Sequence, residues 1–88
     1  MVDAGLRKDP RQFGVELADR VVSQIQIDGI SAEEATSQSA SDVEFRANAL
    51  IAQGVPRQEV RLWVQDVKAA FGERLYERLA EMVEMVRK

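Results

Sequence analysis

The sequence contains neither cysteine nor histidine. The first absence excludes disulfides and thiolate chemistry, and the second excludes imidazole as a general base. A zinc site would have to be built from carboxylates alone, which is rare in proteins. We therefore expect no metal, no cofactor, no catalytic residue and no small-molecule substrate, and we expect that the chain is not an enzyme.

Long hydrophobic runs are also missing, since the longest is the four-residue stretch 49–52. A membrane-spanning helix needs about 20 apolar residues, so no span is predicted. Residues 1–8 have no apolar stretch and no periodic pattern, and we expect a disordered N-terminus there without a secretory signal. The length of 88 residues allows one domain, which we place at 9–88 and expect in the cytoplasm.

The composition that remains is that of a folded protein. Hydrophobic residues make up 45% and charged residues 31%, with five glycines and two prolines. The formal net charge of −3 argues mildly against a dedicated nucleic-acid binder. When the chain is divided into 1–30, 31–54, 55–71 and 72–88, only 55–71 has a net positive charge, with three basic and two acidic residues.

A first helix start is marked by Asp9 and Pro10. Asp9 can accept a backbone N–H as N-cap, and Pro10 lacks the N–H that would have no partner in the first turn. Apolar residues then recur every four positions, which predicts a helix over 10–28. Gly29 follows as a left-handed helix end.

The middle of the chain repeats the start signal twice. Ser31, with a glutamate three residues later, forms a capping box before a polar stretch. We interpret 32–38 as a short helix or a mobile linker, with the helix favoured. Ser41 begins a further capping box, which predicts a separate helix running to Gln53.

The next turn and the last helix have clear signals. Gly54 stands where a C-terminal glycine belongs, and Val55 can contact Leu50 in a Schellman closure. Pro56 then opens a long helix, which we expect to be continuous or kinked at Gly72 because no good N-cap follows that glycine. No strand-like alternation occurs, so the predicted fold is a single all-α bundle of about four helices.

The C-terminal stretch 75–86 of the last predicted helix is apolar over more than half of the helix circumference. The residues that we predict to form a protein interface are Leu75, Tyr76, Leu79, Met82, Val83 and Val86. They form two seams at helical spacing. The first seam consists of Leu75, Leu79, Met82 and Val86 and is expected to pack within the chain. The second seam consists of Tyr76, Val83 and the small Ala80 and is expected to contact another molecule.

These two seams suggest a function, because so short a chain has few elements that could cover both. We expect a small non-enzymatic regulator, antagonist or adaptor that binds a protein partner, or itself as a homodimer, through its C-terminal helix. The alternative for the same residues is a terminal helix buried within its own chain.

A second hypothesis starts from segment 54–64, which resembles the second half of a DNA-binding helix-turn-helix. Gly54 stands at the turn, and Val60 and Trp63 stand where that family holds its recognition helix with apolar residues. The upstream half fits less well, because Gln53 occupies the place of a bulky apolar residue. Trp63 itself is interpreted as a core anchor.

The resemblance implies a dimeric helix-turn-helix transcriptional regulator as the alternative function. The residues that would contact DNA are Arg57, Gln58, Arg61, Gln65 and Lys68. Four of them share one helix face at steps of four, four and three, and such a stripe can contact phosphates and base edges. The alternative is the ordinary polar side of an amphipathic helix, on which Glu59 and Asp66 also lie.

Overall fold

The computed structural model describes the backbone of residues 9–87 and the side chains of residues 9–84. This part of the chain forms three helices and no strand: α1 (Pro10–Gln26), α2 (Ala32–Ala52) and α3 (Arg57–Arg87). The all-α prediction is therefore confirmed. The expectation of disorder at 1–8 lies outside the described residues.

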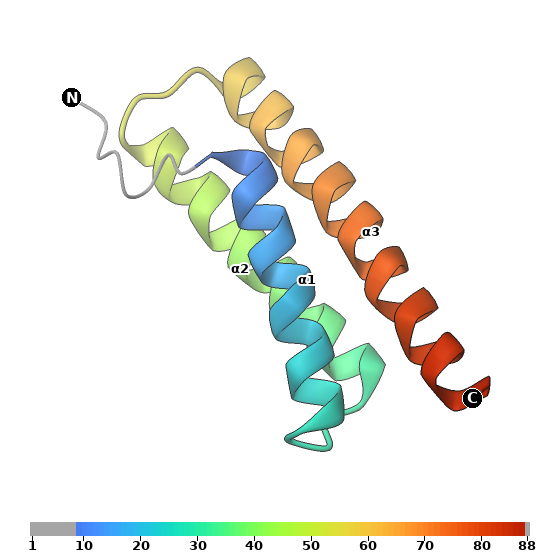
Figure 1. Cartoon of the computed structure of the whole chain (residues 1–88). Helices are drawn as coiled ribbons and strands as arrows, with labels where there is room; N and C mark the ends of the chain where they lie inside the picture. The colour runs from blue at the N-terminus through green and yellow to red at the C-terminus, as the bar shows by residue number, and fades with distance from the viewer. Residues whose placement is uncertain (1–8, 88) are drawn as a thin grey trace.

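The three helices form an elongated bundle of 51 × 20 × 18 Å (Figure 1). Phe13 meets Trp63 near the start of α1 and α3, and Asp19 meets Arg74 farther along both, so these two helices run in the same direction. Helix α2 runs in the opposite direction. Toward its C-terminus, α3 extends away from the other two helices (Figure 1).

Helix α1 begins as the sequence predicts. The Asp9 carboxylate accepts a hydrogen bond from the backbone N–H of Arg11 at 3.0 Å. The side chains of Phe13, Leu17 and Val21 form the expected buried stripe. The helix ends at Gln26, two residues before the predicted end, and the chain then turns through Gly29 at a φ of 70°.

Helix α2 corrects the prediction of two separate elements. The Ser31 hydroxyl does cap its start, accepting from the N–H of Glu34 at 3.1 Å. Ser41, however, lies exposed in the middle of one continuous helix and caps nothing. The reason is that Ala35, Ser39 and Val43 lie at steps of four and are all buried, so small side chains extend the packed face through the polar stretch. The bundle therefore has three helices instead of about four.

The turn between α2 and α3 is the predicted Schellman closure. The N–H of Val55 donates to the carbonyl of Leu50 at 3.1 Å, and that of Gly54 donates to Ile51 at 3.0 Å. Gly54 has a φ of 96°, which favours glycine. Helix α3 starts directly after Pro56 and continues through position 72 without interruption, as the favoured prediction stated.

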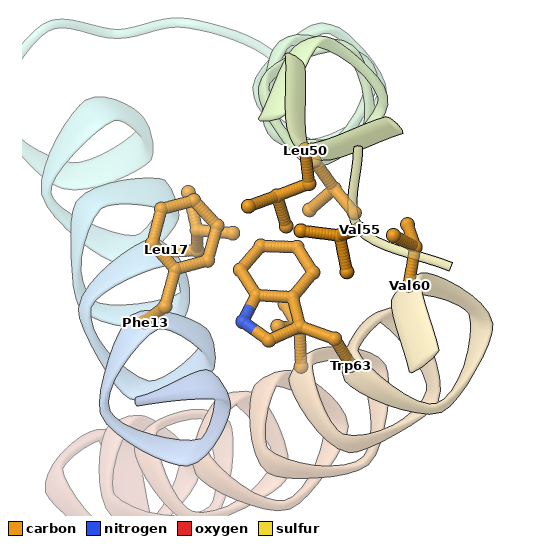
Figure 2. Close-up of a cluster of buried hydrophobic side chains, with 8 residues drawn as sticks. Phe13, Leu17, Leu50, Val55, Val60 and Trp63 are labelled. Carbon is orange, nitrogen blue, oxygen red and sulfur yellow. The ribbon is translucent and has the colours of Figure 1, made fainter. Parts of the chain in front are cut away.

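The core is centred on Trp63, which is 7% exposed and confirms its prediction as an anchor. Figure 2 shows its indole between α1, α2 and the turn that carries Val55. The Phe13 and Trp63 ring centroids are 5.6 Å apart. The guanidinium of Arg46 lies 4.6 Å from the centroid of the Phe13 ring, so a cation–π contact adds to this aromatic pair.

Helices α1 and α3 approach closely at Gly14. A Cβ atom at this position would lie 2.4 Å from the carbonyl oxygen of Val67 and 2.9 Å from the Cβ of Ala70. Ala18, one turn further along α1, is fully buried. Small residues thus allow the two backbones to touch, and this contact fixes which face of α3 points inward.

Candidate protein-binding surface on the C-terminal helix

Helix α3 has an inner face that packs on the bundle. Its buried members are Val60, Trp63, Val67 and Ala70. One turn further along, the inner positions are taken by Arg74 and Arg78, which are partly buried. No described residue after Ala70 is fully buried, so the apolar core stops midway along this helix.

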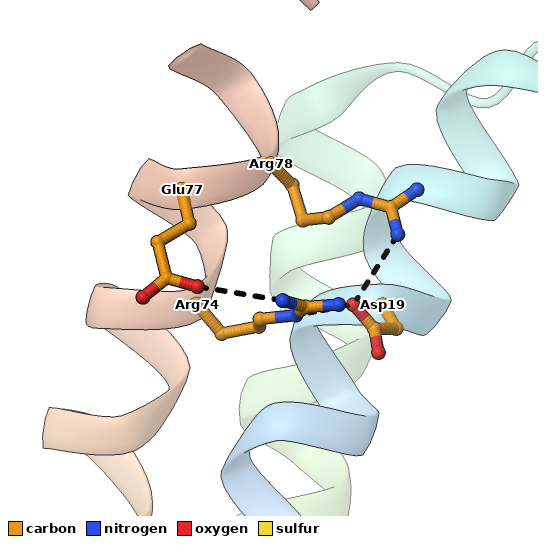
Figure 3. A network of polar contacts seen from close by, with 4 residues as sticks. All are labelled: Asp19, Arg74, Glu77 and Arg78. Atoms are coloured by element: carbon orange, nitrogen blue, oxygen red, sulfur yellow. Dashed lines mark hydrogen bonds and ion pairs between the residues drawn. The ribbon is translucent and has the colours of Figure 1, made fainter. Parts of the chain in front are cut away.

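The inner face continues as a polar contact with α1 (Figure 3). The Arg74 Nε donates to Asp19 Oδ1 at 2.9 Å, and Arg78 Nη1 lies 3.8 Å from the same oxygen. The hydrogen bond to Asp19 is the main cause that raises the pKa of Arg74 above the ordinary arginine value. A contact to Glu77 at 3.4 Å acts in the same sense. Two cations of α3 are therefore held against α1 and not directed outward.

The opposite face of α3 exposes large apolar side chains. Leu62 is 54% exposed, Tyr76 76%, Leu79 44% and Val83 55%. Together with three intervening residues they recur at alternating steps of three and four. We call this set the outer seam: Leu62, Gln65, Ala69, Gly72, Tyr76, Leu79 and Val83. On a helix with 3.6 residues per turn, it lies opposite the buried positions Val60 and Val67.

The predicted interface residues are divided by the structure. Tyr76 and Val83 lie on the outer seam, and Leu75 and Met82 beside it are half-buried. Leu79 was expected to pack within the chain, and its 44% exposure makes that expectation wrong. The arginines described above occupy the inner positions instead. The prediction for Val86 lies outside the described side chains.

The N-terminal half of the outer seam was not predicted from the sequence. Leu62, Ala69 and Gly72 continue the same spacing for two further heptads toward the start of α3. The signal was present as a repeat of seven from Leu62 to Val83. It was overlooked because alanine and glycine do not register as apolar anchors, although they permit close helix contacts.

A groove of about 550 Å³ separates α2 from α3. Most of its lining is apolar, and the residues concerned are Leu17, Thr36, Ser39, Ala40, Val43, Glu44, Ala47, Val64, Val67, Lys68 and Phe71. The Ser39 hydroxyl is buried there without a hydrogen-bond partner. No pattern in the sequence indicated this groove, because it depends on how far apart two helices pack.

The five residues of the DNA hypothesis are all exposed on the first half of α3: Arg57, Gln58, Arg61, Gln65 and Lys68. The surrounding geometry differs from the resemblance. The pairs Arg20–Asp42 and Gln24–Gln38 show that α2 runs opposite to α1, and hence opposite to α3. In a helix-turn-helix the two helices cross at about 90–120° instead.

Other kinds of site were sought across the described residues. No three acidic side chains among residues 9–84 lie close enough together to hold a metal ion. No helix in the described part of the chain combines the length and the apolarity needed to cross a membrane. Comparisons with protein-family models, curated proteins and solved structures found no match. The function must therefore be argued from the surface of α3.

Proposed function

We propose that this chain is a small non-enzymatic interaction protein, a regulator, antagonist or adaptor, that binds a protein partner or a second copy through the outer face of α3. One observation carries the proposal: four large apolar side chains are exposed in one row on that face. The non-enzymatic part of the proposal rests on the absence of cysteine and histidine from the sequence.

The exposed apolar side chains of α3 can still gain free energy by binding a partner. Fully burying a leucine, valine or tyrosine-sized side chain stabilises by roughly 1.5–3 kcal/mol. Tyr76 and Val83 keep more than half of their surface in water, so most of this gain is still available to a partner. Exposed apolar residues that stand singly need no explanation, but Tyr76, Leu79 and Val83 follow one another at successive turns of one face, and such a row is typical of a contact site.

The shape and the polarity of the outer face of α3 indicate which kind of partner it can bind. The face is narrow and apolar from Tyr76 to Val83, and the glutamates at 73, 77 and 84 line one side of it. Such a surface suits the apolar stripe of another helix, which binds by side-chain packing over a long contact. An extended peptide would instead need an unpaired backbone edge, and a helix offers none.

The test is a double substitution on the outer face with a matched control. Tyr76→Asp combined with Val83→Asp should abolish association and partner capture while the helical circular dichroism spectrum is kept. The control is Ile27→Asp with Phe45→Asp, because these side chains are 80% and 72% exposed, and they lie directly after α1 and on α2, respectively. Equal behaviour of the two variants would contradict the proposal.

DNA binding as a dimeric transcriptional regulator is kept as a second candidate, because the five polar side chains named for it are all exposed. Changing Arg57 and Arg61 to Ala should then weaken DNA binding and flatten its dependence on salt. The measurement is binding to mixed genomic fragments at about 50 mM salt, where electrostatic attraction is strong. Absence of binding by the unaltered protein at that salt would remove this candidate.

A further inference from the structure

We propose that the partner of the outer seam is the outer seam of a second copy, with the two α3 helices antiparallel about a two-fold axis midway between Gly72 and Tyr76. This inference rests on the proposed function, because it names the partner of the same surface. It goes further in fixing the orientation and the register. Both follow from how large and small residues are distributed along the seam.

The antiparallel register places a large side chain against a small one. A two-fold axis at position 74 brings Gly72 opposite the second copy's Tyr76, and Ala69 opposite the second copy's Leu79. The same axis brings Gln65 opposite the second copy's Val83. Each layer therefore has a similar total volume, so the two helices can keep one separation along the whole contact, as tight packing requires.

The parallel register lacks this match. It would bring Gly72 against Gly72 and Ala69 against Ala69, which leaves two consecutive layers almost empty. The next layer would force two Tyr76 rings into one position. Helices paired in this way would have to approach and then separate within a single heptad, and the voids would forfeit packing contacts.

Gly72 supplies an independent observation. A glycine in a helix interior is destabilising relative to alanine, so a reason is expected for its presence. At Gly14 the reason lies within the chain, because α3 leaves no room for a Cβ atom. At Gly72 a Cβ atom would meet nothing within 4 Å. The space there is open on the outer face, where the second copy's Tyr76 would lie.

The residues that flank the seam fit the antiparallel pairing through their aliphatic parts. Arg61 and Lys68 lie along one side of the seam, and the half-buried Leu75 and Met82 lie along the same side of its other half. An antiparallel two-fold brings the two halves together, so the stems of the cations cover Leu75 and Met82. A parallel pairing would gain ion pairs from Arg61 and Lys68, but exposed ion pairs contribute little.

The size of the contact is adequate for a specific but weak dimer. Leu62 and Val83 lie about 32 Å apart along the helix axis. A helix pair in contact over that length, with its flanking residues, falls near the roughly 1,200 Å² lower end of specific interfaces. We therefore expect association at micromolar concentrations and not below.

Cysteine cross-linking tests the register directly, because the natural chain has no cysteine. In the antiparallel dimer, Ala69→Cys and Leu79→Cys mixed together should form a disulfide-linked dimer, and each variant alone should form very little. The reason is that positions 69 of the two copies would be separated by about 15 Å along the axis. Efficient cross-linking of each variant with itself would overturn the antiparallel register.

A second pair of variants tests, without a covalent link, whether large side chains of one copy pack against small residues of the other. Gly72→Leu should weaken dimerisation at least tenfold, because the added side chain occupies the place of the second copy's Tyr76. Adding Tyr76→Ala to Gly72→Leu exchanges large for small and should restore dimerisation. Sedimentation of the full chain over a range from about 1 µM to 1 mM measures both effects. A tighter Gly72→Leu dimer would overturn the proposal.

The outcomes separate this inference from the proposed function. Suppose that the unaltered protein stays monomeric over this range yet captures another protein, and that Tyr76→Asp with Val83→Asp abolishes the capture. Self-pairing is then overturned and the proposed function stands. If that double variant associates and captures as the unaltered protein does, both are overturned.

Discussion

The carbonyl oxygen of Val67 lies where a Cβ atom of residue 14 would have to be, because a Cβ built on Gly14 would be only 2.4 Å from it. Helices α1 and α3 therefore touch backbone to backbone at this point. The Cβ atom of Ala70 would also lie only 2.9 Å from a Cβ atom built on Gly14. This contact turns the inner face of α3 toward α1 and leaves the outer seam in solvent.

The contact predicts opposite effects of one substitution at two glycines. Gly14→Ala should destabilise the fold by about 1–3 kcal/mol through overpacking, which exceeds the gain of about 1 kcal/mol in helix propensity. Gly72→Ala meets nothing and should stabilise by about 0.5–1 kcal/mol. Urea unfolding at low protein concentration measures both. A stabilising Gly14→Ala would show that the two helices do not touch.

A second prediction concerns the unpartnered hydroxyl in the groove. Ser39→Ala should raise the free energy of unfolding, because a buried polar group without a partner costs about 1–3 kcal/mol. Ser37→Ala is the matched control, since Ser37 is exposed on the same helix and gains only the propensity of alanine. The difference between the two variants isolates the hydroxyl. Equal effects would mean that the Ser39 hydroxyl is satisfied in solution.

The polar contact between α1 and α3 gives a third prediction. Asp19→Asn removes the acceptor that Arg74 and Arg78 share, and it should lower the urea midpoint slightly. The effect should shrink as salt is added, because these side chains are 31–40% exposed. Glu77→Gln should have a smaller effect, because the Glu77 side chain is 62% exposed and that of Asp19 is 40% exposed.

The same contact should be insensitive to alkali. The pKa of Arg74 is raised, chiefly by its hydrogen bond to Asp19, so its stabilising contribution is fully present at neutral and moderately alkaline pH. It would be lost only as the pH rises through that elevated pKa, far above neutrality. Urea midpoints measured between about pH 7 and 9 should therefore show no loss from this contact. If the urea midpoint declined steeply with pH in the unaltered protein and not in Asp19→Asn, this prediction would be contradicted.

Local signals in the sequence predicted the ends of the helices well. The caps at Asp9 and Ser31 and the closure of Val55 on Leu50 each depend on a few neighbouring residues, and all three are present. Ser41 carries the same local signal, but no helix begins there. Whether a serine starts a helix or lies within one depends on the burial of the preceding turns, and Ser39 is buried only because a second helix covers it.

The candidate surface was predicted in part for a similar reason. Periodicity indicated two apolar seams near the C-terminus, but it assigned Leu79 to the interior. The inner positions belong to Arg74 and Arg78, whose partner Asp19 is far away in the sequence. An arginine that packs its stem inward and pairs with a distant carboxylate looks like a solvent-exposed residue in any local pattern.

The last prediction tests how far the interaction surface extends. The sequence alone placed the interface at residues 75–86, whereas the structure extends the exposed row back to Leu62, which is 54% exposed. If the whole outer seam is used, Leu62→Asp should weaken self-association about as much as Val83→Asp, since a charge buried at either end of the contact is unpaired. Light scattering and sedimentation of the two variants measure this.

Phe45→Asp serves as the control for this comparison, because Phe45 is 72% exposed on α2 and outside the seam. It should leave self-association unchanged. The buried Trp63 reports on the fold in every variant, since it is the only tryptophan and lies in the core. A dimer that is insensitive to Leu62→Asp but lost with Val83→Asp would confine the interface to the C-terminal half of α3. In that case the two-fold axis could not lie at position 74, because an axis there requires both halves of the seam to be in contact.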